Sequence, residues 1–429
     1  MEDKVEVRKK STNVETTTLH PVPPEEKRSW VSVMLIQAGA QICVPSLLLG
    51  GLLVEAMPLK SALIAGLIGY LCVAVLISFV GIIGRDLSVT TCVVAKGIFG
   101  DVCARVVISS VFTITFIGWF AIQNTVCGES FTNFMAYFGI HIPISVSSII
   151  WGVIMMITAV YGVKALNALN VIAIPGLMIL MAVGTYMAIK EYGTETAFAS
   201  KDSTISMIEA IVMVISFSAC AICTCCDFTR YQKTRKDTVL ANSIGIAGGG
   251  YLVLVLGAVM SAITQKYDIT EVLMDLGLVI LGMTILILAT WTTNTVNSYS
   301  AGINLVMLFK AKDDKRALFT LIAGLISTIA AVLGLLNHLE SFINWLGNVY
   351  MPLIGAMIGD YWIVFRAKAS DFKFKVGWDW IGIISVAVGL IVAVLIPYGI
   401  PAIQGGVTSF ILIIVLRRAF NDKRAKSID

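Results

Sequence analysis

Long apolar stretches, each long enough to cross a bilayer, alternate with short polar connections along most of this chain. A membrane-spanning helix needs about 20 mostly apolar residues. Runs of that kind lie at about 30–54, 61–84, 103–127, 143–163, 167–189, 206–226, 238–263, 277–309, 316–336, 341–365, 379–397 and 400–416. The pattern predicts twelve transmembrane helices in one domain at 30–416, between terminal tails at 1–29 and 417–429.

The composition agrees with an all-α integral membrane protein. Of the 429 residues 57% are hydrophobic and 14% are charged, and the mean hydropathy is +0.88, which excludes a water-soluble globular protein. The net charge of +4 is small, and the basic residues stand in short clusters between apolar runs. We therefore expect a lipid bilayer, and no nucleic acid, as a partner.

The basic residues also predict the orientation in the membrane, because lysine and arginine concentrate in cytoplasmic loops. The first 29 residues lack the apolar core of a cleavable signal peptide, so they are expected to be a cytosolic tail. With this tail inside, only four of the 31 lysines and arginines fall outside: Lys60, Lys190, Lys201 and Lys266. We expect both termini to be cytoplasmic, the membrane to be the plasma membrane, and the polar stretch 85–100 to form a short helix at the inner surface.

Nine cysteines are present, nearly all inside apolar runs, and we expect them to be free thiols that act as small hydrophobic residues. The spacing of Cys220, Cys223, Cys225 and Cys226 also suggests a soft metal site. No histidine lies near this group, and Cys225 points away from Cys223 on a helix. The sequence therefore predicts no cofactor, and no metal beyond a coupling ion.

The first apolar run carries polar and helix-breaking residues at membrane depth: Gln37, Gly39, Gln41 and Pro45. Such residues are tolerated where the backbone unwinds beside a site, and the freed carbonyls are suitable ligands for a small cation. The alternative is a simple proline kink whose glutamines bond to neighbouring helices. The run at 206–226 carries Ser216, Phe217 and Ser218 among small residues, which suggests a second break close to the first.

The third run places an aromatic plate beside an amide. Trp119 and Gln123 are four residues apart and so share one helix face. An indole can stack on a planar ring, and an amide can donate and accept hydrogen bonds together. Trp119 lies near the middle of its run, which argues against the alternative of an aromatic belt at the membrane interface.

The eighth run is unusually polar between Thr290 and Ser300. Thr292 and Thr293 supply adjacent hard oxygens that suit an alkali cation together with carbonyls near Gln37 and Ala40. Asn294 and Asn297 are three apart and present amides to one side. The alternative is that the hydroxyls bond back to their own helix.

Five ordered motifs of this chain resemble one family of membrane carriers. They are Gly118-Trp119-Phe120, Val171-Ile172-Ala173-Ile174-Pro175, Asp227-Phe228-Thr229-Arg230-Tyr231, Trp291-Thr292-Thr293-Asn294, and Pro352-x-x-Gly355 with Asp360-Tyr361. The chain resembles the nucleobase:cation symporter-1 family, and within it the cytosine permeases.

The resemblance implies a leucine-transporter-type fold, in which helices 1–5 and 6–10 form a 5+5 inverted repeat and two further helices follow. It implies import of a nucleobase or related small heterocycle, cytosine first, by sodium or proton symport with alternating access. Residues expected at the substrate are Gln41, Trp119, Gln123, Phe217 or Ser218, Asn294 and Asn297, and those expected at the cation are Gln37, Ala40, Thr292 and Thr293.

Several alternatives remain open at this point. Ala289 stands where cytosine permeases carry a polar residue, so the substrate and the ion need separate tests. Proton coupling through Glu129 or Asp227, transport of allantoin, hydantoin, hydroxymethylpyrimidine or a purine, and a sensor without transport are the other readings. An enzyme is not expected, because the three histidines form no metal pair and no nucleophile elbow occurs. A monomer is the expected assembly.

Overall fold

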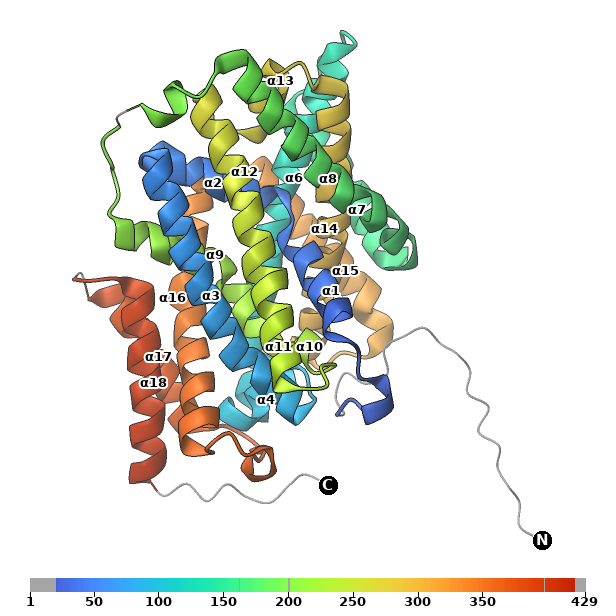
Figure 1. The fold of residues 1–429 in the computed structure, drawn as a ribbon. Coiled ribbons are helices and arrows are strands. Elements are labelled where there is room, and N and C mark those ends of the chain that lie inside the picture. The colour runs from blue at the N-terminus through green and yellow to red at the C-terminus, as the bar shows by residue number, and fades with distance from the viewer. Residues whose placement is uncertain (1–20, 162, 200, 397, 421–429) are drawn as a thin grey trace.

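The computed structural model describes residues 21–161, 163–199, 201–396 and 398–420, with side chains left out for 161–172. Residues 1–20 and 421–429 of the two predicted tails lie outside the described residues. The described chain is an upright bundle of helices, and α1 begins at the same end of the bundle at which α18 ends (Figure 1).

The helices match the twelve predicted spans. They are α1 (Trp30–Gln41) with α2 (Val44–Ala56), α3 (Leu59–Leu87), α6 (Ser109–Tyr137), α7 (Ile144–Tyr161), α8 (Val163–Tyr192), α9 (Met207–Thr224), α11 (Arg235–Asn242) with α12 (Gly249–Thr264), α14 (Val279–Phe309), α15 (Arg316–Val332), α16 (Leu339–Ile358), α17 (Trp380–Leu395) and α18 (Pro401–Ala419). Within the described residues eight helices are long and apolar enough to span a bilayer, and the bent pair α1 and α2 makes a ninth; three shorter apolar helices lie at other predicted spans, which is consistent with twelve.

The predicted break in the first span is confirmed. α1 ends at Gln41, α2 starts at Val44, and the two helices meet at 57°. Pro45 stands in the first turn of α2, a position that tolerates its missing N–H. The Gln41 carbonyl, freed from helical bonding, accepts from Cys43 N at 3.0 Å and from Ser46 Oγ at 2.7 Å. The bend is therefore held by local hydrogen bonds.

The predicted break at Ser216, Phe217 and Ser218 is wrong. α9 runs without interruption from Met207 to Thr224. No glycine or proline stands in this stretch, so nothing removes a helical hydrogen bond. Its small residues serve packing instead: a Cβ on Gly347 of α16 would lie 2.1 Å from Ser216 Oγ.

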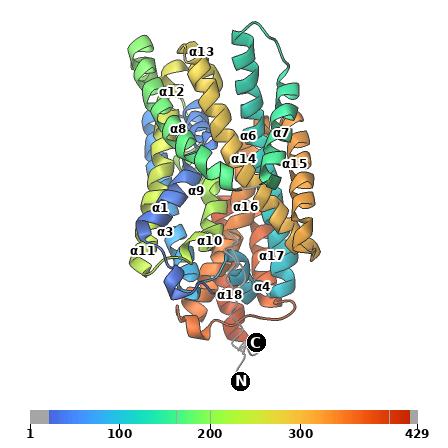
Figure 2. The same ribbon diagram turned by 90° about the vertical axis from the view of Figure 1, so that its right-hand side faces the viewer.

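Helices that the inverted repeat would relate pack against each other. α6 lies along α14, and α7 lies against α15, as Figure 2 shows.

α2 and α12 approach closely at two glycines: a Cβ on Gly50 would lie 2.3 Å from Leu254 O, and one on Gly257 would lie 2.4 Å from Leu47 O. Small residues at such contacts are the usual basis of helix association in membranes.

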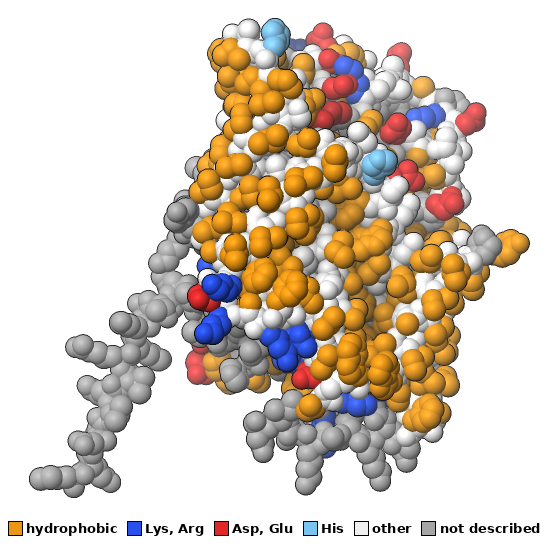
Figure 3. All heavy atoms as spheres, turned by 180° about the vertical axis from the view of Figure 1, so that it is seen from behind, with side chains coloured by type: hydrophobic (Ala, Val, Ile, Leu, Met, Phe, Trp, Pro, Cys, Tyr) orange, Lys and Arg blue, Asp and Glu red, His pale blue; other side chains and the backbone are white. Residues whose placement is uncertain are grey.

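Apolar side chains cover the middle of the molecule, and charged side chains gather toward its two ends (Figure 3). The lysines predicted to lie outside are found together at one end, where Lys201 Nζ donates to Val54 O at 2.9 Å and Lys266 pairs with Asp275 at 2.7 Å. The predicted short helix is present at the opposite end as α4 (Thr91–Phe99). Asp227 of the Asp-Phe-Thr-Arg-Tyr motif accepts from Thr91 N at 2.8 Å and so fixes the start of α4.

A buried cluster of ion pairs connects the C-terminal helices α17 and α18 to the rest of the bundle. Arg417 of α18 is 3% exposed and bonds to Asp360 at 3.1 Å and to Asp379 at 2.8 Å. It also donates to Ile98 O of α4 at 3.1 Å. Asp360 of the Asp360-Tyr361 motif is thus paired, and the cluster ties α4, α17 and α18 to the segment that follows α16.

Candidate functional site

Three aromatic rings, from α6, α9 and α16, meet within the bundle. The Trp119 ring of α6 lies edge-on to Phe217 of α9, with centroids 5.3 Å apart, and to Phe342 of α16, at 5.2 Å. Gly118 leaves room for Phe342, since a Cβ there would lie 2.4 Å from its ring. Of the two candidates on α9, it is Phe217 whose ring contacts Trp119, and Ser218 lies near the Tyr70 hydroxyl instead.

Gln123 is one turn beyond Trp119 and is 2% exposed. Its side-chain oxygen has no hydrogen-bond partner among the described residues. A buried acceptor without a partner is costly, so this amide is suited to a ligand or a water that supplies a donor.

Gln41 ends α1 at the break. Its side-chain nitrogen donates to the Tyr70 hydroxyl of α3 at 3.2 Å, and both residues are buried. The contacts from Trp119 through Phe217 and its neighbour Ser218 to Tyr70 connect the aromatic group to this amide.

Gln37 has a different role from that of Gln41. Its side-chain nitrogen donates to Asn242 of α11 at 2.8 Å, and Asn242 donates to Ile77 O of α3 at 2.9 Å. The side-chain nitrogen therefore ties α1 to its neighbours, as the kink alternative expected, while the side-chain oxygen is buried with no hydrogen-bond partner among the described residues. The carbonyl of Ala40 lies in the last turn of α1, where helix geometry leaves C=O groups without helical donors.

The hydroxyls of Thr292 and Thr293 both donate to Ala289 O, at 3.0 and 2.9 Å. This is the back-bonding that the sequence left open, and it still leaves oxygen lone pairs for another ligand. Asn294 donates to Phe120 O of α6 at 3.0 Å and accepts from Asn297 at 3.1 Å. Asn294 thus holds α14 against α6, and Asn297 lies beside it.

Three residues of this region were missed in the sequence. Tyr70 is the one tyrosine in the apolar run 61–84 and lies near its middle, a signal that could have marked it. Asn242 begins another apolar run and carries the same signal. Phe342 is an ordinary aromatic in an apolar helix, and nothing in its pattern distinguishes it.

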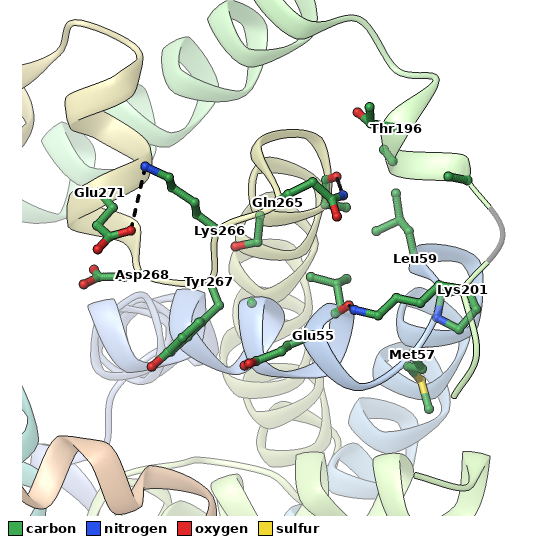
Figure 4. Close-up of a pocket in the computed structure, with 17 residues that line it drawn as sticks. Glu55, Met57, Leu59, Thr196, Lys201, Gln265, Lys266, Tyr267, Asp268 and Glu271 are labelled. Atoms are coloured by element: carbon green, nitrogen blue, oxygen red, sulfur yellow. Dashed lines mark hydrogen bonds and ion pairs between the residues drawn. The ribbon is translucent and has the colours of Figure 1, made fainter. Parts of the chain in front are cut away.

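A cavity of about 490 Å³ opens at the end of the bundle opposite to α4, between the end of α2 and the loop that follows α12 (Figure 4). Figure 4 shows Tyr267 and Glu55 side by side, and Lys266 turned toward Glu271. Burial and the nearby carboxylates, first that of Glu55, raise the pKa of Tyr267. Its lining includes three acids and two lysines: Glu55, Asp268, Glu271, Lys201 and Lys266.

The nine cysteines are free thiols, and within the described ranges no three His, Cys, Asp or Glu side chains gather into a metal site.

The features described so far are a broken first span, a group of aromatic rings with amides near it, and a polar eighth span. Together they define a membrane carrier rather than an enzyme.

Comparisons with known proteins also identify the chain as a membrane carrier. Residues 21–412 match the family described as permeases for cytosine/purines, uracil, thiamine and allantoin. The cytosine permease of Escherichia coli K12 is 26% identical over 399 residues, which cover 92% of this chain and 93% of the relative. The hydantoin permease of Microbacterium maritypicum is 25% identical over 58% of this chain and 57% of its own.

Among solved structures, Mhp1 in its inward-facing conformation superposes with a TM-score of 0.79 at 17% identity, covering 95% of this chain and 96% of that one. Mhp1 is described as a nucleobase-cation-symport-1 family transporter. The fold is therefore of the leucine-transporter type. The chain belongs to this family of cytosine and purine permeases, and it is a multi-pass membrane transporter.

Proposed function

We propose that this permease imports a small planar heterocycle, cytosine first, by cation symport. The observation that carries the proposal is the aromatic group in which the Trp119 ring contacts Phe217, with Gln123 one turn away carrying a buried amide oxygen that has no hydrogen-bond partner among the described residues. The E. coli cytosine permease, which is similar over nearly its whole length, supports the choice of cytosine.

The chemistry of these groups fits a heterocycle. In nucleic-acid complexes, stacking on an aromatic side chain contributes about 1–3 kcal/mol per base, and an amide pairs with a base edge through two hydrogen bonds. We propose that a flat substrate enters between Trp119 and Phe217, which now touch edge-on, and meets Gln123, Gln41 and the amides of Asn294 and Asn297. The second ring is assigned to Phe217 rather than Ser218.

We propose a sodium site between the carbonyls of Gln37 and Ala40 on α1 and the hydroxyls of Thr292 and Thr293 on α14. Both hydroxyls donate to Ala289 O, so their lone pairs are free to meet a cation. Proton coupling is the second candidate. It is favoured by Glu129, one of whose oxygens is buried without a hydrogen-bond partner among the described residues.

We further propose that the protein is a monomer in the plasma membrane with both termini in the cytoplasm. Support comes from the clustering of basic residues at the end of the bundle where α1 begins and α18 ends, because such residues remain on the cytoplasmic side.

Uptake into proteoliposomes tests the function. Vesicles that contain the purified protein are offered labelled cytosine, uracil, purines, hydantoin, allantoin and hydroxymethylpyrimidine, with and without an inward sodium gradient or pH gradient. We expect cytosine to accumulate above its outside concentration under one of the two gradients. Binding without accumulation under either gradient would indicate a sensor, and accumulation of a different heterocycle alone would replace cytosine.

A further inference from the structure

Tyr70 is a buried phenol in the middle of α3, and the site described above assigns it no role. Only 2% of the residue is exposed, and its hydroxyl accepts the side-chain N–H of Gln41 at 3.2 Å. Gln41 is the last residue of α1, so its side chain projects where the regular helix stops. A side chain at a helix end has more freedom than one within the helix, and the bond to Tyr70 removes that freedom.

The Tyr70 ring is itself held by close packing on two sides. A Cβ on Gly250, at the start of α12, would lie 2.5 Å from a ring carbon of Tyr70 and 2.6 Å from its hydroxyl oxygen. Tyr251 packs edge-on against the ring with centroids 6.4 Å apart. The neighbouring Gly69 lets α3 approach α9, because a Cβ there would lie 2.7 Å from Val214. The hydroxyl therefore has one position.

We propose that Tyr70 is a positioning residue that fixes the amide of Gln41 for substrate recognition. This inference rests on the proposed function. With the Gln41 nitrogen directed to Tyr70, its side-chain oxygen remains as an acceptor at the end of α1. The substrate edge that meets Gln41 is therefore an N–H donor, and heterocycles without a ring or exocyclic N–H at that edge are rejected, since they would leave the acceptor unpaired.

A double-mutant cycle on cytosine binding and uptake tests this role. Tyr70→Phe removes only the hydroxyl, and Gln41→Ala removes the amide. We expect Tyr70→Phe to weaken binding and to raise KM about fivefold, with little change in kcat. A loss of affinity of about fivefold is the effect expected from losing one neutral hydrogen bond. In the Gln41→Ala background the same change should have no further effect, because Tyr70 acts through Gln41.

The matched control is Tyr251→Phe. Its hydroxyl lies in the same cluster but donates to Leu63 O at 3.4 Å rather than to Gln41. We expect wild-type affinity from this variant. An equal loss in Tyr251→Phe, or an additive loss in the double mutant, would show that Tyr70 acts only through general packing.

A second variant covers the case in which Tyr70→Phe does not fold. Gln41→Asn keeps an amide that is too short to reach Tyr70, and it should weaken cytosine binding as Tyr70→Phe does. Unchanged binding in Gln41→Asn and Gln41→Ala, with wild-type protein still transporting cytosine, overturns the role of Tyr70 and leaves the proposed function standing. A wild-type protein that binds no heterocycle of the panel overturns both.

Discussion

Trp119 is the residue on which the proposed substrate site most depends, since it contacts the aromatic rings of both α9 and α16. Trp119→Ala is expected to abolish detectable substrate binding, because stacking contributes about 1–3 kcal/mol. Trp119→Phe should keep part of the affinity. Calorimetric titration of the purified protein measures both. Trp380→Ala, at a position 62% exposed, is the control and should bind normally. Wild-type affinity in Trp119→Ala would remove Trp119 from the site.

At the scale of single residues the sequence predicted which side chains are unusual but not always what they contact. Trp119 and Gln123 follow from helical spacing, which is local information. Gln37 and Gln41 look equivalent in the sequence, yet one bonds to Asn242 and the other to Tyr70. That difference depends on where α3 and α11 lie, and no local pattern contains it. The choice of Phe217 over Ser218 likewise required the rotation of α9 relative to α6.

Among the helices, α2 and α12 form the contact most sensitive to a small substitution. Gly257→Ala would place its Cβ 2.4 Å from Leu47 O, a backbone atom that cannot move aside. We expect a destabilisation of about 1–3 kcal/mol, as is typical of overpacking, seen as a lower melting temperature in detergent. Gly176→Ala is the matched control, since its nearest neighbour would lie at 3.7 Å. Equal melting temperatures for the two variants would contradict the packing argument.

The segment that precedes α1 is attached to the end of α3 and to the Asp-Phe-Thr-Arg-Tyr segment that follows α9. Val22 is buried and donates through its backbone to Ser88 O at 2.8 Å, and Arg28 donates to Tyr231 O at 2.8 Å. Lys27 donates to Ser88 Oγ at 2.7 Å and to Arg230 O at 2.5 Å. The start of helix 1 is thus bound to the ends of two other spans.

Lys27 makes this attachment dependent on pH. Burial, and then the nearby Arg85, lower the pKa of Lys27 to about 8 against an ordinary value of 10.5, while Asp86 opposes the shift. Below about pH 8 the ammonium is charged in both the folded and unfolded states, so this group does not make the free energy of unfolding change with pH in that range. Between about pH 8 and pH 10.5 the unfolded state binds more protons, so the stability of the wild type should rise relative to Lys27→Met. Melting temperatures of both proteins across this range test it, and a constant difference would contradict the shift.

Most helices of the bundle were predictable because a run of about twenty mostly apolar residues is typical of a membrane-spanning helix. The break after Gln41 was predictable as well, because Pro45 acts locally. The break expected in α9 was wrong because small polar residues serve packing as readily as unwinding. The π-helical turns at Ala104–Ile108, Ser243–Gly248 and Gly359–Val364 had no distinguishing signal in the sequence.

At the scale of the whole molecule, interhelical hydrogen bonds separate two groups of helices. In one group, Asn124 of α6 donates to Ser148 O of α7 at 2.9 Å, and Asn294 of α14 donates to Phe120 O of α6. In the other, Gln37, Asn242 and Tyr70 connect α1, α11 and α3. The proposed substrate lies between Trp119 of the first group and Phe217 of α9, which packs against α3 of the second group where Gly69 meets Val214. Movement of one group against the other would therefore open or close the site without breaking these bonds.

The proposed sodium site also joins the two groups, because Ala40 belongs to α1 and Thr292 and Thr293 belong to α14. A cation bound there would hold both groups in the arrangement that binds substrate, so substrate affinity should rise with sodium concentration. Each ligand strengthens the binding of the other by the same coupling free energy, typically about 1–3 kcal/mol. Thr292→Ala or Thr293→Ala should weaken that dependence more than it weakens binding at saturating sodium. Calorimetry in sodium and in choline buffers measures the coupling, with Thr185→Ala as a control, since the Thr185 hydroxyl bonds back to Met181 O within α8 at 2.8 Å. Identical affinity in the two buffers, together with a dependence on pH that Glu129→Gln removes, would assign the coupling to protons instead.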